Sequence, residues 1–279
     1  MRKELSAAVR YKTGFFGKIY LWLVLLLLYL PIVTVVVYSF NDSKSSAEWV
    51  GFTLDWYRRL FTSGKYEAGL QNSLLVAVCS VIGAGVIGTS AAVGAASRSF
   101  RTRGAFESLS ILPIMIPEII MGMSLLSVFT MAGIPLGLGA IILAHITFCI
   151  PYIYLVVRSR LSGMDKSVVE AARDLGASRT RAFLTVTVPL LAPAIGGGCL
   201  LAFAMSFDDV VISFFLMSPG ADMLPVQIYS ALKLGLTPEI NALFTMMLSI
   251  VILAIAVWML FSKLLPGRTK KSIEIKKTP

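Results

Sequence analysis

Six long apolar blocks run through the sequence, and each is long enough to cross a lipid bilayer. The blocks cover residues 19–40, 73–97, 108–131, 136–157, 190–217 and 241–264. A transmembrane helix needs about 20 predominantly apolar residues, and a helix satisfies all its backbone polar groups within one segment. Only 14% of the residues are charged, against about 25% in a typical soluble domain. The sequence therefore predicts an all-α integral membrane protein with six transmembrane helices.

The distribution of Lys and Arg predicts the orientation of these helices. Twenty of the 25 Lys and Arg residues lie before the first block, after the second, after the fourth and after the sixth. Basic residues concentrate on the cytoplasmic side, so we expect both termini to be cytoplasmic. The net charge of +10 then reflects topology and contact with anionic headgroups, and no nucleic-acid partner is implied.

These observations predict three parts of the chain. Residues 1–18 form a basic cytoplasmic N-terminus, residues 19–264 the transmembrane domain and residues 265–279 a basic cytoplasmic tail. The first block follows basic residues, as in a secretory signal, but it is too long for one and no A-x-A-like site follows it. We therefore expect it to be an uncleaved span.

Three acidic residues lie inside the apolar blocks, and they are the first candidate site. Glu118 follows Pro113 and Pro117 in the third block, and Asp208 and Asp209 lie in the fifth. A charge at the centre of a bilayer costs about 2.5–3.5 kcal/mol, and no Lys or Arg lies mid-span to neutralise these acids. They must face water, be protonated, pair across subunits or meet a cationic cargo. The two prolines predict a kinked third helix.

Helical geometry predicts different roles for the two aspartates, because consecutive residues point about 100° apart. In a regular fifth helix, Asp209 shares a face with Ser206 and Ser213, whereas Asp208 shares one with Met205 and Ile212. We therefore expect Asp209 and Ser206 to line a path, and Asp208 to be buried or to reach another helix at a gate.

Two further side chains have two interpretations each. His145 in the fourth block is either a helix–helix hydrogen-bonding residue or a ligand or proton relay, and no metal-ligand spacing accompanies it. Trp56 belongs to an aromatic group in the outer loop 41–72. This group is either an interfacial belt or a surface that binds a cation by cation–π contact.

Small residues in the second block predict close helix packing. Gly83–Gly88 spells G-x-G-x-x-G, but it lies mid-membrane, where a dinucleotide site is not expected. Small residues instead let a neighbouring helix approach closely.

The basic segment 165–189 between the fourth and fifth blocks predicts a protein-docking element. Ser167 and Glu170 fit a capping box, and Gly176 fits the left-handed residue that ends a helix. Ser178 is then a natural N-cap for a second short helix. Two short helices with a small turn can enter a groove on a partner.

Glu170-Ala171-Ala172, Gly176 and Pro189 have the spacing of the "EAA" loop, so the chain resembles the permease subunits of ABC importers. Where that family has I-x-L-P, this chain has Val186-Thr187-Val188-Pro189, which departs in size only. The resemblance implies the type I ABC importer permease fold in a bacterial inner membrane. It also implies a loop that docks on a cytoplasmic ATPase. The residues expected at this contact are Glu170, Ala171, Ala172, Asp174, Gly176 and Pro189.

Within that family, the chain looks most like the second permease subunit of spermidine/putrescine importers. The resemblance rests on Ser39–Asn41, His145–Cys149, Asp208–Val211, Leu224-Pro225 and Pro238–Leu243. It implies a second permease subunit, two copies of the ATPase and an extracytoplasmic solute-binding protein as partners. The chain has no G-x-x-x-x-G-K-[ST] motif. We therefore expect no catalytic residues, no metal and no cofactor of its own, with ATP bound by a partner.

Other readings remain open, because related permeases share some of these strings. The same machine could carry another cationic amine, an amino acid derivative or iron. An ion-coupled secondary carrier is a further alternative, but such carriers usually contain internal repeats, which we do not find, and they need no docking loop.

Overall fold

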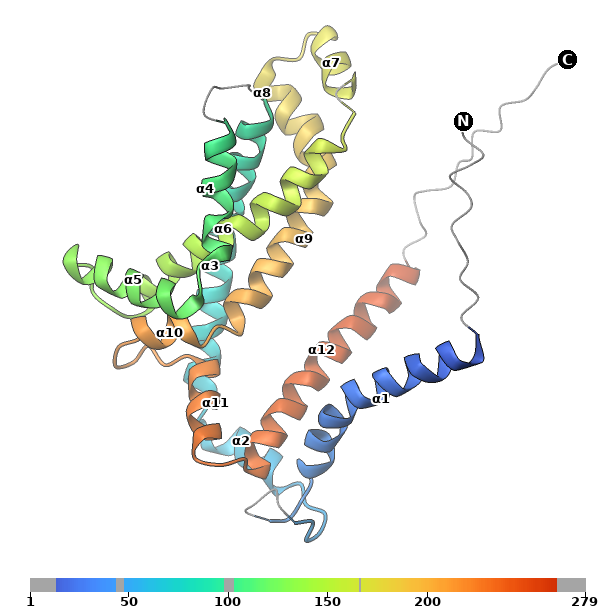
Figure 1. The fold of residues 1–279 in the computed structure, drawn as a ribbon, viewed down its shortest axis with the longest axis vertical. Coiled ribbons are helices and arrows are strands. Elements are labelled where there is room, and N and C mark those ends of the chain that lie inside the picture. The colour runs from blue at the N-terminus through green and yellow to red at the C-terminus, as the bar shows by residue number, and fades with distance from the viewer. Residues whose placement is uncertain (1–13, 44–47, 98–102, 166, 265–279) are drawn as a thin grey trace, which may run out of the picture. The chain divides into compact units, whose positions relative to one another are not determined.

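The computed structural model describes residues 14–43, 48–97, 103–165 and 167–264, and this part of the chain is almost entirely helical (Figure 1). It divides into two compact units. One unit is formed by residues 64–233, and the other combines the segments on either side of it. The basic N-terminus expected at 1–18 and the tail expected at 265–279 lie wholly or mostly outside the described residues.

In its described part, the smaller unit contains three helices: α1 (Phe15–Tyr38), α2 (Asp55–Ser63) and α12 (Pro238–Leu264). α12 packs against both α1 and α2. The chain after α1 turns around Asn41, which is fully buried and forms an isolated antiparallel bridge with Phe52. Its side chain accepts a hydrogen bond from the Val50 N–H and donates one to the Glu48 carbonyl. Asn41 therefore organises the described part of the outer loop.

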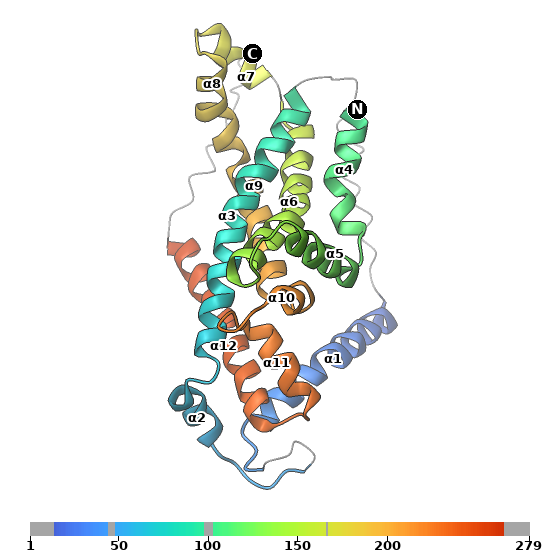
Figure 2. The ribbon, with the colours of Figure 1, turned by 90° about the vertical axis from the view of Figure 1, so that its left-hand side faces the viewer.

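The larger unit is built on three long helices that run side by side: α3 (Glu67–Ser97), α6 (Leu138–Ser162) and α9 (Val188–Phe207) (Figure 2). Close approach is confirmed at Gly88, where a Cβ would lie 3.0 Å from the Ile150 carbonyl oxygen. Gly198 is similar, since a Cβ there would lie 3.2 Å from the Cα of Ile153. Small residues thus let α3 and α9 both pack on the backbone of α6.

The third apolar block is not one kinked helix, as the sequence suggested, but two helices. α4 (Arg103–Met115) and α5 (Glu118–Met131) meet at an angle of 105°. Pro117 stands at the N-cap position of α5 in an extended conformation. Proline lacks an N–H, and the residue before it disfavours the helical region. Helix α4 therefore ends at Met115, and α5 begins in a new direction at Glu118.

The fifth block also differs from the regular helix that the sequence suggested. Its helix begins earlier, because α8 (Arg179–Ala182) continues through the π-helical turn η1 (Phe183–Thr187) into α9. The second short helix expected in segment 165–189 is therefore the start of this span. α9 ends at Phe207, and a separate helix, α10 (Val211–Leu216), follows. The aspartates lie in this break.

By length and composition, five described helices can cross a membrane, and a sixth crossing requires α4 and α5 to be taken together. Two short helices complete the larger unit: α7 (Ser167–Asp174) and α11 (Leu224–Lys233). Within this unit, α7 and α8 lie at one end of the three-helix core, whereas α10 and α11 lie toward the other (Figures 1 and 2).

Candidate functional site

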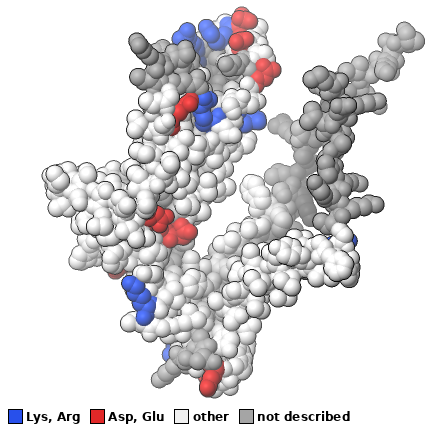
Figure 3. Space-filling view, viewed as in Figure 1, with Lys and Arg blue, Asp and Glu red and all other residues white. Residues whose placement is uncertain are grey.

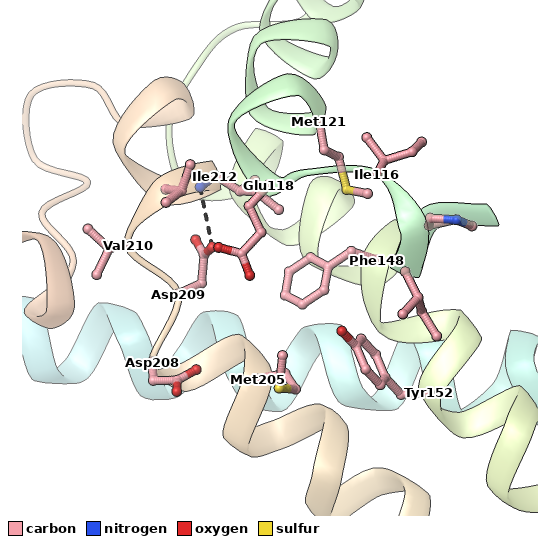
Figure 4. A pocket seen from close by; sticks show the side chains of 13 residues that line it. Ile116, Glu118, Met121, Phe148, Tyr152, Met205, Asp208, Asp209, Val210 and Ile212 are labelled. Carbon is pink, nitrogen blue, oxygen red and sulfur yellow. Dashed lines mark hydrogen bonds between the residues drawn. The ribbon is translucent and has the colours of Figure 1, made fainter. Parts of the chain in front are cut away.

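A cavity of about 360 Å³ lies where the two helix breaks of the larger unit meet α6 (Figure 4). α5 and α10 pack against each other, and α10 also contacts α6. The cavity is lined by Pro113, Ile114, Ile116, Glu118, Met121, Phe148, Tyr152, Met205, Asp208, Asp209, Val210, Val211 and Ile212. All three intramembrane acids are therefore brought to one cavity, although they come from spans that are distant in sequence.

Two of these carboxylates are exposed. Glu118 is the first residue of α5, and Asp208 is the C-cap of α9. Each acid therefore lies at the end of a broken helix rather than on a helix face. Figure 3 shows an acidic patch midway along this unit, with uncharged surface directly around it. No Lys or Arg is among the described residues that line the cavity.

Asp209 differs from the other two acids because it is buried and its carboxylate is hydrogen-bonded. Its Oδ2 accepts from the Ser213 N–H and hydroxyl, both at 2.8 Å, and its Oδ1 accepts from the Ile212 N–H at 3.3 Å. The carboxylate thus satisfies first-turn N–H groups of α10. The geometry expected from a regular helix is wrong here. Asp208, not Asp209, is the exposed member of the pair, because α9 ends between Ser206 and Asp208.

His145 on α6 is the partner of Asp209. The imidazole is fully buried, with Nε2 3.3 Å from Asp209 Oδ2 and Nδ1 2.7 Å from Ser206 Oγ. The prediction of a helix–helix hydrogen-bonding histidine is confirmed. Sequence reasoning nevertheless sought only Lys or Arg as a counter-charge and missed this pairing. Ser206 is also buried and bonds to His145, so it does not line the cavity.

Trp56 lies on α2, in the smaller unit. Its indole Nε1 donates to the Asn41 carbonyl at 2.9 Å, which fixes the ring to the outer loop. The guanidinium of Arg59 lies 5.0 Å from the ring centroid. The cation on this ring is therefore a side chain of the same helix.

In the turn between α7 and α8, Gly176 adopts the left-handed conformation that the sequence predicted for the end of a helix. Gly176 has φ +89°, its N–H donates to the Arg173 carbonyl, and the Ala177 N–H donates to the Ala172 carbonyl. This is the Schellman arrangement that ends a helix. Ser178 is confirmed as the N-cap of α8, because its side chain accepts from the Arg181 N–H.

The capping box at Ser167 is wrong. Ser167 is the first residue of α7, and its N–H donates to Asp165 Oδ1 at 2.9 Å. Hydrogen bonds from the Ser167 N–H and hydroxyl lower the pKa of Asp165 below its ordinary value. A charged carboxylate two residues earlier has replaced the serine hydroxyl as the cap. Glu170 is exposed in the first turn and is free of that role.

Three of the six expected docking residues, Glu170, Asp174 and Gly176, share one hollowed surface. An open depression of about 460 Å³ is lined by Glu170, Arg173, Asp174, Gly176, Ala177, Ser178 and Arg179. Charged side chains gather over α7 and α8 (Figure 3). Ala171, Ala172 and Pro189 are not part of its lining, and Pro189 is the second residue of α9, after the π-helical turn. Its missing N–H removes one backbone hydrogen bond from the helix at that point.

The fold and these two sites define a class of protein. Over residues 84–271 the chain matches the family described as "Binding-protein-dependent transport system inner membrane component". The chain belongs to this family and is a multi-pass inner-membrane permease. Permeases of this kind are non-catalytic subunits that work with a partner permease, an ATPase and a periplasmic binding protein.

Curated relatives of known name cover most of the chain. The "Spermidine/putrescine transport system permease protein PotC" of Escherichia coli (strain K12) is 40% identical over 235 residues, which is 84% of this chain and 87% of that protein. The "Putrescine transport system permease protein PotI" of the same organism is 39% identical over 244 residues, covering 85% and 87%.

Solved structures support the type I ABC importer permease fold. A chain of a bacterial ABC transporter involved in import of the acidic polysaccharide alginate superposes with a TM-score of 0.69 at 18% identity. The match covers 88% of this chain and 95% of that one. At this identity the likeness concerns the fold alone.

Proposed function

We propose that this chain is one of two different permease subunits of an ATP-driven importer of polyamines, and that it forms half of the translocation path. The observation that supports the substrate most directly is the cavity, where Glu118 and Asp208 present exposed carboxylates without a lining Lys or Arg. The names of the relatives, which transport spermidine and putrescine, point to the same class of cargo.

The chemistry of the cavity suits a flexible organic cation. Two carboxylates can each pair with one ammonium group, while the lining rings of Phe148 and Tyr152 provide apolar contact area for the methylene chain. Burying charges at membrane depth is costly unless they are paired. Pairing with a cationic cargo therefore offsets the free-energy cost of desolvating these acids. Asp209 contributes less to this attraction, because its oxygens already accept hydrogen bonds within the chain.

We propose that α7 and the turn to α8 dock on the cytoplasmic ATPase, with Glu170, Ala171, Ala172, Asp174 and Gly176 at the contact and Pro189 in the helix behind it. Val168 on α7 and Leu175 directly after it support this proposal, since both are exposed, Leu175 at 90%. An apolar side chain so exposed at a structured turn suits insertion into a partner's groove. α8 continues through η1 into α9, so a displacement of the turn passes along one helix toward Asp208.

Both termini are cytoplasmic in this proposal, and the α7–α8 end lies on the same side. Two ATPase copies bind below the permease pair, and a solute-binding protein delivers cargo from the opposite side. Trp56 then belongs to the outer surface, where it anchors the loop or borders the entrance of the path.

The proposal is tested by reconstituting the chain with its partner permease, the ATPase and candidate binding proteins in proteoliposomes. We expect polyamine-loaded binding protein to stimulate ATP hydrolysis and to drive polyamine uptake. Stimulation by an anion or a sugar, with none by polyamines, would overturn the substrate. Uptake in the absence of the ATPase would overturn the class and favour an ion-coupled carrier.

A further inference from the structure

We propose that His145 is the positioning residue for Asp208: it ties both sides of the α9–α10 break to α6 and thereby fixes the cargo-facing carboxylate. This inference rests on the proposed function, because it assumes that Asp208 faces the cargo. It assigns a role to a residue that does not itself line the cavity.

The two nitrogens of His145 contact opposite sides of the break. Nδ1 lies 2.7 Å from Ser206 Oγ, in the last turn of α9. Nε2 lies 3.3 Å from Asp209 Oδ2 and 3.3 Å from Ser213 Oγ, at the start of α10. Asp208 stands between these two points of attachment. With residues 206 and 209 both joined to one rigid ring, the backbone at Asp208 has little freedom to turn.

Together with the Ile212 and Ser213 N–H groups that donate to Asp209, the side chains of this network satisfy one another within the described part of the chain. The Ser206 hydroxyl donates to Nδ1, Nε2–H donates to Asp209, and the Ser213 hydroxyl also donates to Asp209. We assign the ring proton to Nε2, because this tautomer satisfies all of these groups at once. His145, Ser206 and Ser213 are fully buried, so water cannot replace a lost contact without entering the core.

The ring of His145 also contacts the cavity wall. Its centroid lies 5.0 Å from that of Phe148 in an edge-to-face arrangement, and Phe148 lines the cavity beside Asp209 (Figure 4). No Pro or Gly lies between Phe207 and Leu216, so the break is held by side-chain contacts, among them the cap that Asp209 forms on the first turn of α10. The position of Asp208 therefore depends on side-chain contacts more than on backbone chemistry.

The decisive experiment is a double-mutant cycle between His145→Ala and Asp208→Asn in the complete transporter. Uptake is measured per assembled complex in proteoliposomes with loaded binding protein. We expect each single variant to lose about tenfold in uptake, and the double variant to lose no more than about tenfold, because both remove the same carboxylate from its place. A multiplied loss of about a hundredfold would show that His145 acts independently and would overturn the proposal.

Two isosteric variants separate the contacts of the ring. The amide of His145→Gln reaches the place of Nε2 and can still donate to Asp209, whereas His145→Asn reaches only the place of Nδ1. We expect Gln to restore most of the uptake and Asn to restore less, and the reverse order would contradict the role of Asp209. Cys149→Ala is the matched control, since Cys149 is also fully buried on α6 and contacts α9 through the Ala202 carbonyl.

The design keeps two failures apart. If the transporter carries another solute instead of polyamines, the cycle is run with that solute. The coupling between the His145 and Asp208 variants then tests the role of His145 independently of the proposed substrate. Should His145→Ala not assemble, Ser213→Ala takes its place in the cycle, because it removes the hydroxyl shared by His145 and Asp209. Additive losses from Ser213→Ala and Asp208→Asn would equally overturn the proposal.

Discussion

A Cβ placed on Gly122 would lie 2.7 Å from Cδ2 of Phe215, so the backbone of α5 and the ring on α10 are in direct contact. α5 begins at Glu118, and α10 follows the aspartate pair. The contact therefore joins the two helix breaks that supply the carboxylates of the cavity. The spacing between these acids depends on how closely α5 and α10 approach.

Gly122→Ala is expected to separate α5 from α10 and to widen the acidic cavity. Overpacking a closely fitted contact costs about 1–3 kcal/mol, so both the thermal midpoint of the purified complex and cargo uptake should fall. Adding Phe215→Leu should recover part of both losses by giving up the clashing ring atom. Gly139→Ala is the control, because a Cβ there meets nothing within 4 Å. Equal behaviour of the Gly122 and Gly139 variants would contradict the role of this contact.

Substitution by Asn is expected to lower uptake at Asp208 and to lower the stability of the complex at Asp209. Asp208→Asn removes an exposed charge from the cavity and should lower uptake about tenfold while leaving the denaturation midpoint of the complex unchanged. Asp209→Asn turns one buried acceptor into a donor facing other donors, which costs about 1–3 kcal/mol. Chemical denaturation and uptake, measured on the same preparations, distinguish the two. An Asp209→Asn complex that is stable but inactive would contradict this distinction and would indicate that Asp209 binds the cargo.

Gly176→Ala is expected to uncouple transport from ATP hydrolysis. Gly176 has φ +89°, and a residue with a Cβ pays about 1 kcal/mol or more in the left-handed region. The turn should loosen, so that the cargo-stimulated ATPase rate falls while the complex still assembles. Gly176→Asn should do less harm, because Asn tolerates this conformation. Gly163→Ala is the matched control, with φ −95° at the end of α6.

Acid is expected to loosen α7 by protonating Asp165. The folded-state pKa of this carboxyl is lowered by the hydrogen bonds from Ser167. Its contribution is therefore fully present above the ordinary Asp pKa of about 3.9 and is lost as the pH falls through the lower folded pKa. Backbone amide exchange in α7 should thus be insensitive to Asp165 protonation between pH 5 and 8. Asp165→Ala should accelerate that exchange at neutral pH, whereas Glu170→Ala should not; acceleration by Glu170→Ala alone would restore the capping box.

Much of the fold was predictable from local chemistry. The apolar blocks predicted the long helices α1, α3, α6, α9 and α12 because hydrocarbon demands internally satisfied backbones. Gly176 and Ser178 predicted the ends of α7 and α8 because each supplies a specific terminal conformation or acceptor. Pro117 predicted a disturbance in the third block but not the 105° turn, since proline only removes a hydrogen bond and packing sets the new direction.

The break at Asp208–Asp209 was missed because the apolar run continues through it. A signal was present: aspartate is a favoured cap of a helix start, and Asp209 accepts from the Ile212 and Ser213 N–H groups. Periodicity alone assigned these residues to one regular helix. That choice reversed the exposure of the two carboxylates.

The sequence by itself determined that this chain spans a membrane and, through the spacing of Glu170, Gly176 and Pro189, that it resembles the importer permeases, because block lengths and motif spacing are properties of the linear chain. Only the tertiary structure decided which acids meet. Glu118, Asp208 and Asp209 share one cavity because α5 and α10 turn away from their spans and pack together. His145 becomes the partner of Asp209 only when α6 lies beside the break, since a buried charge selects its partner through space and not along the sequence.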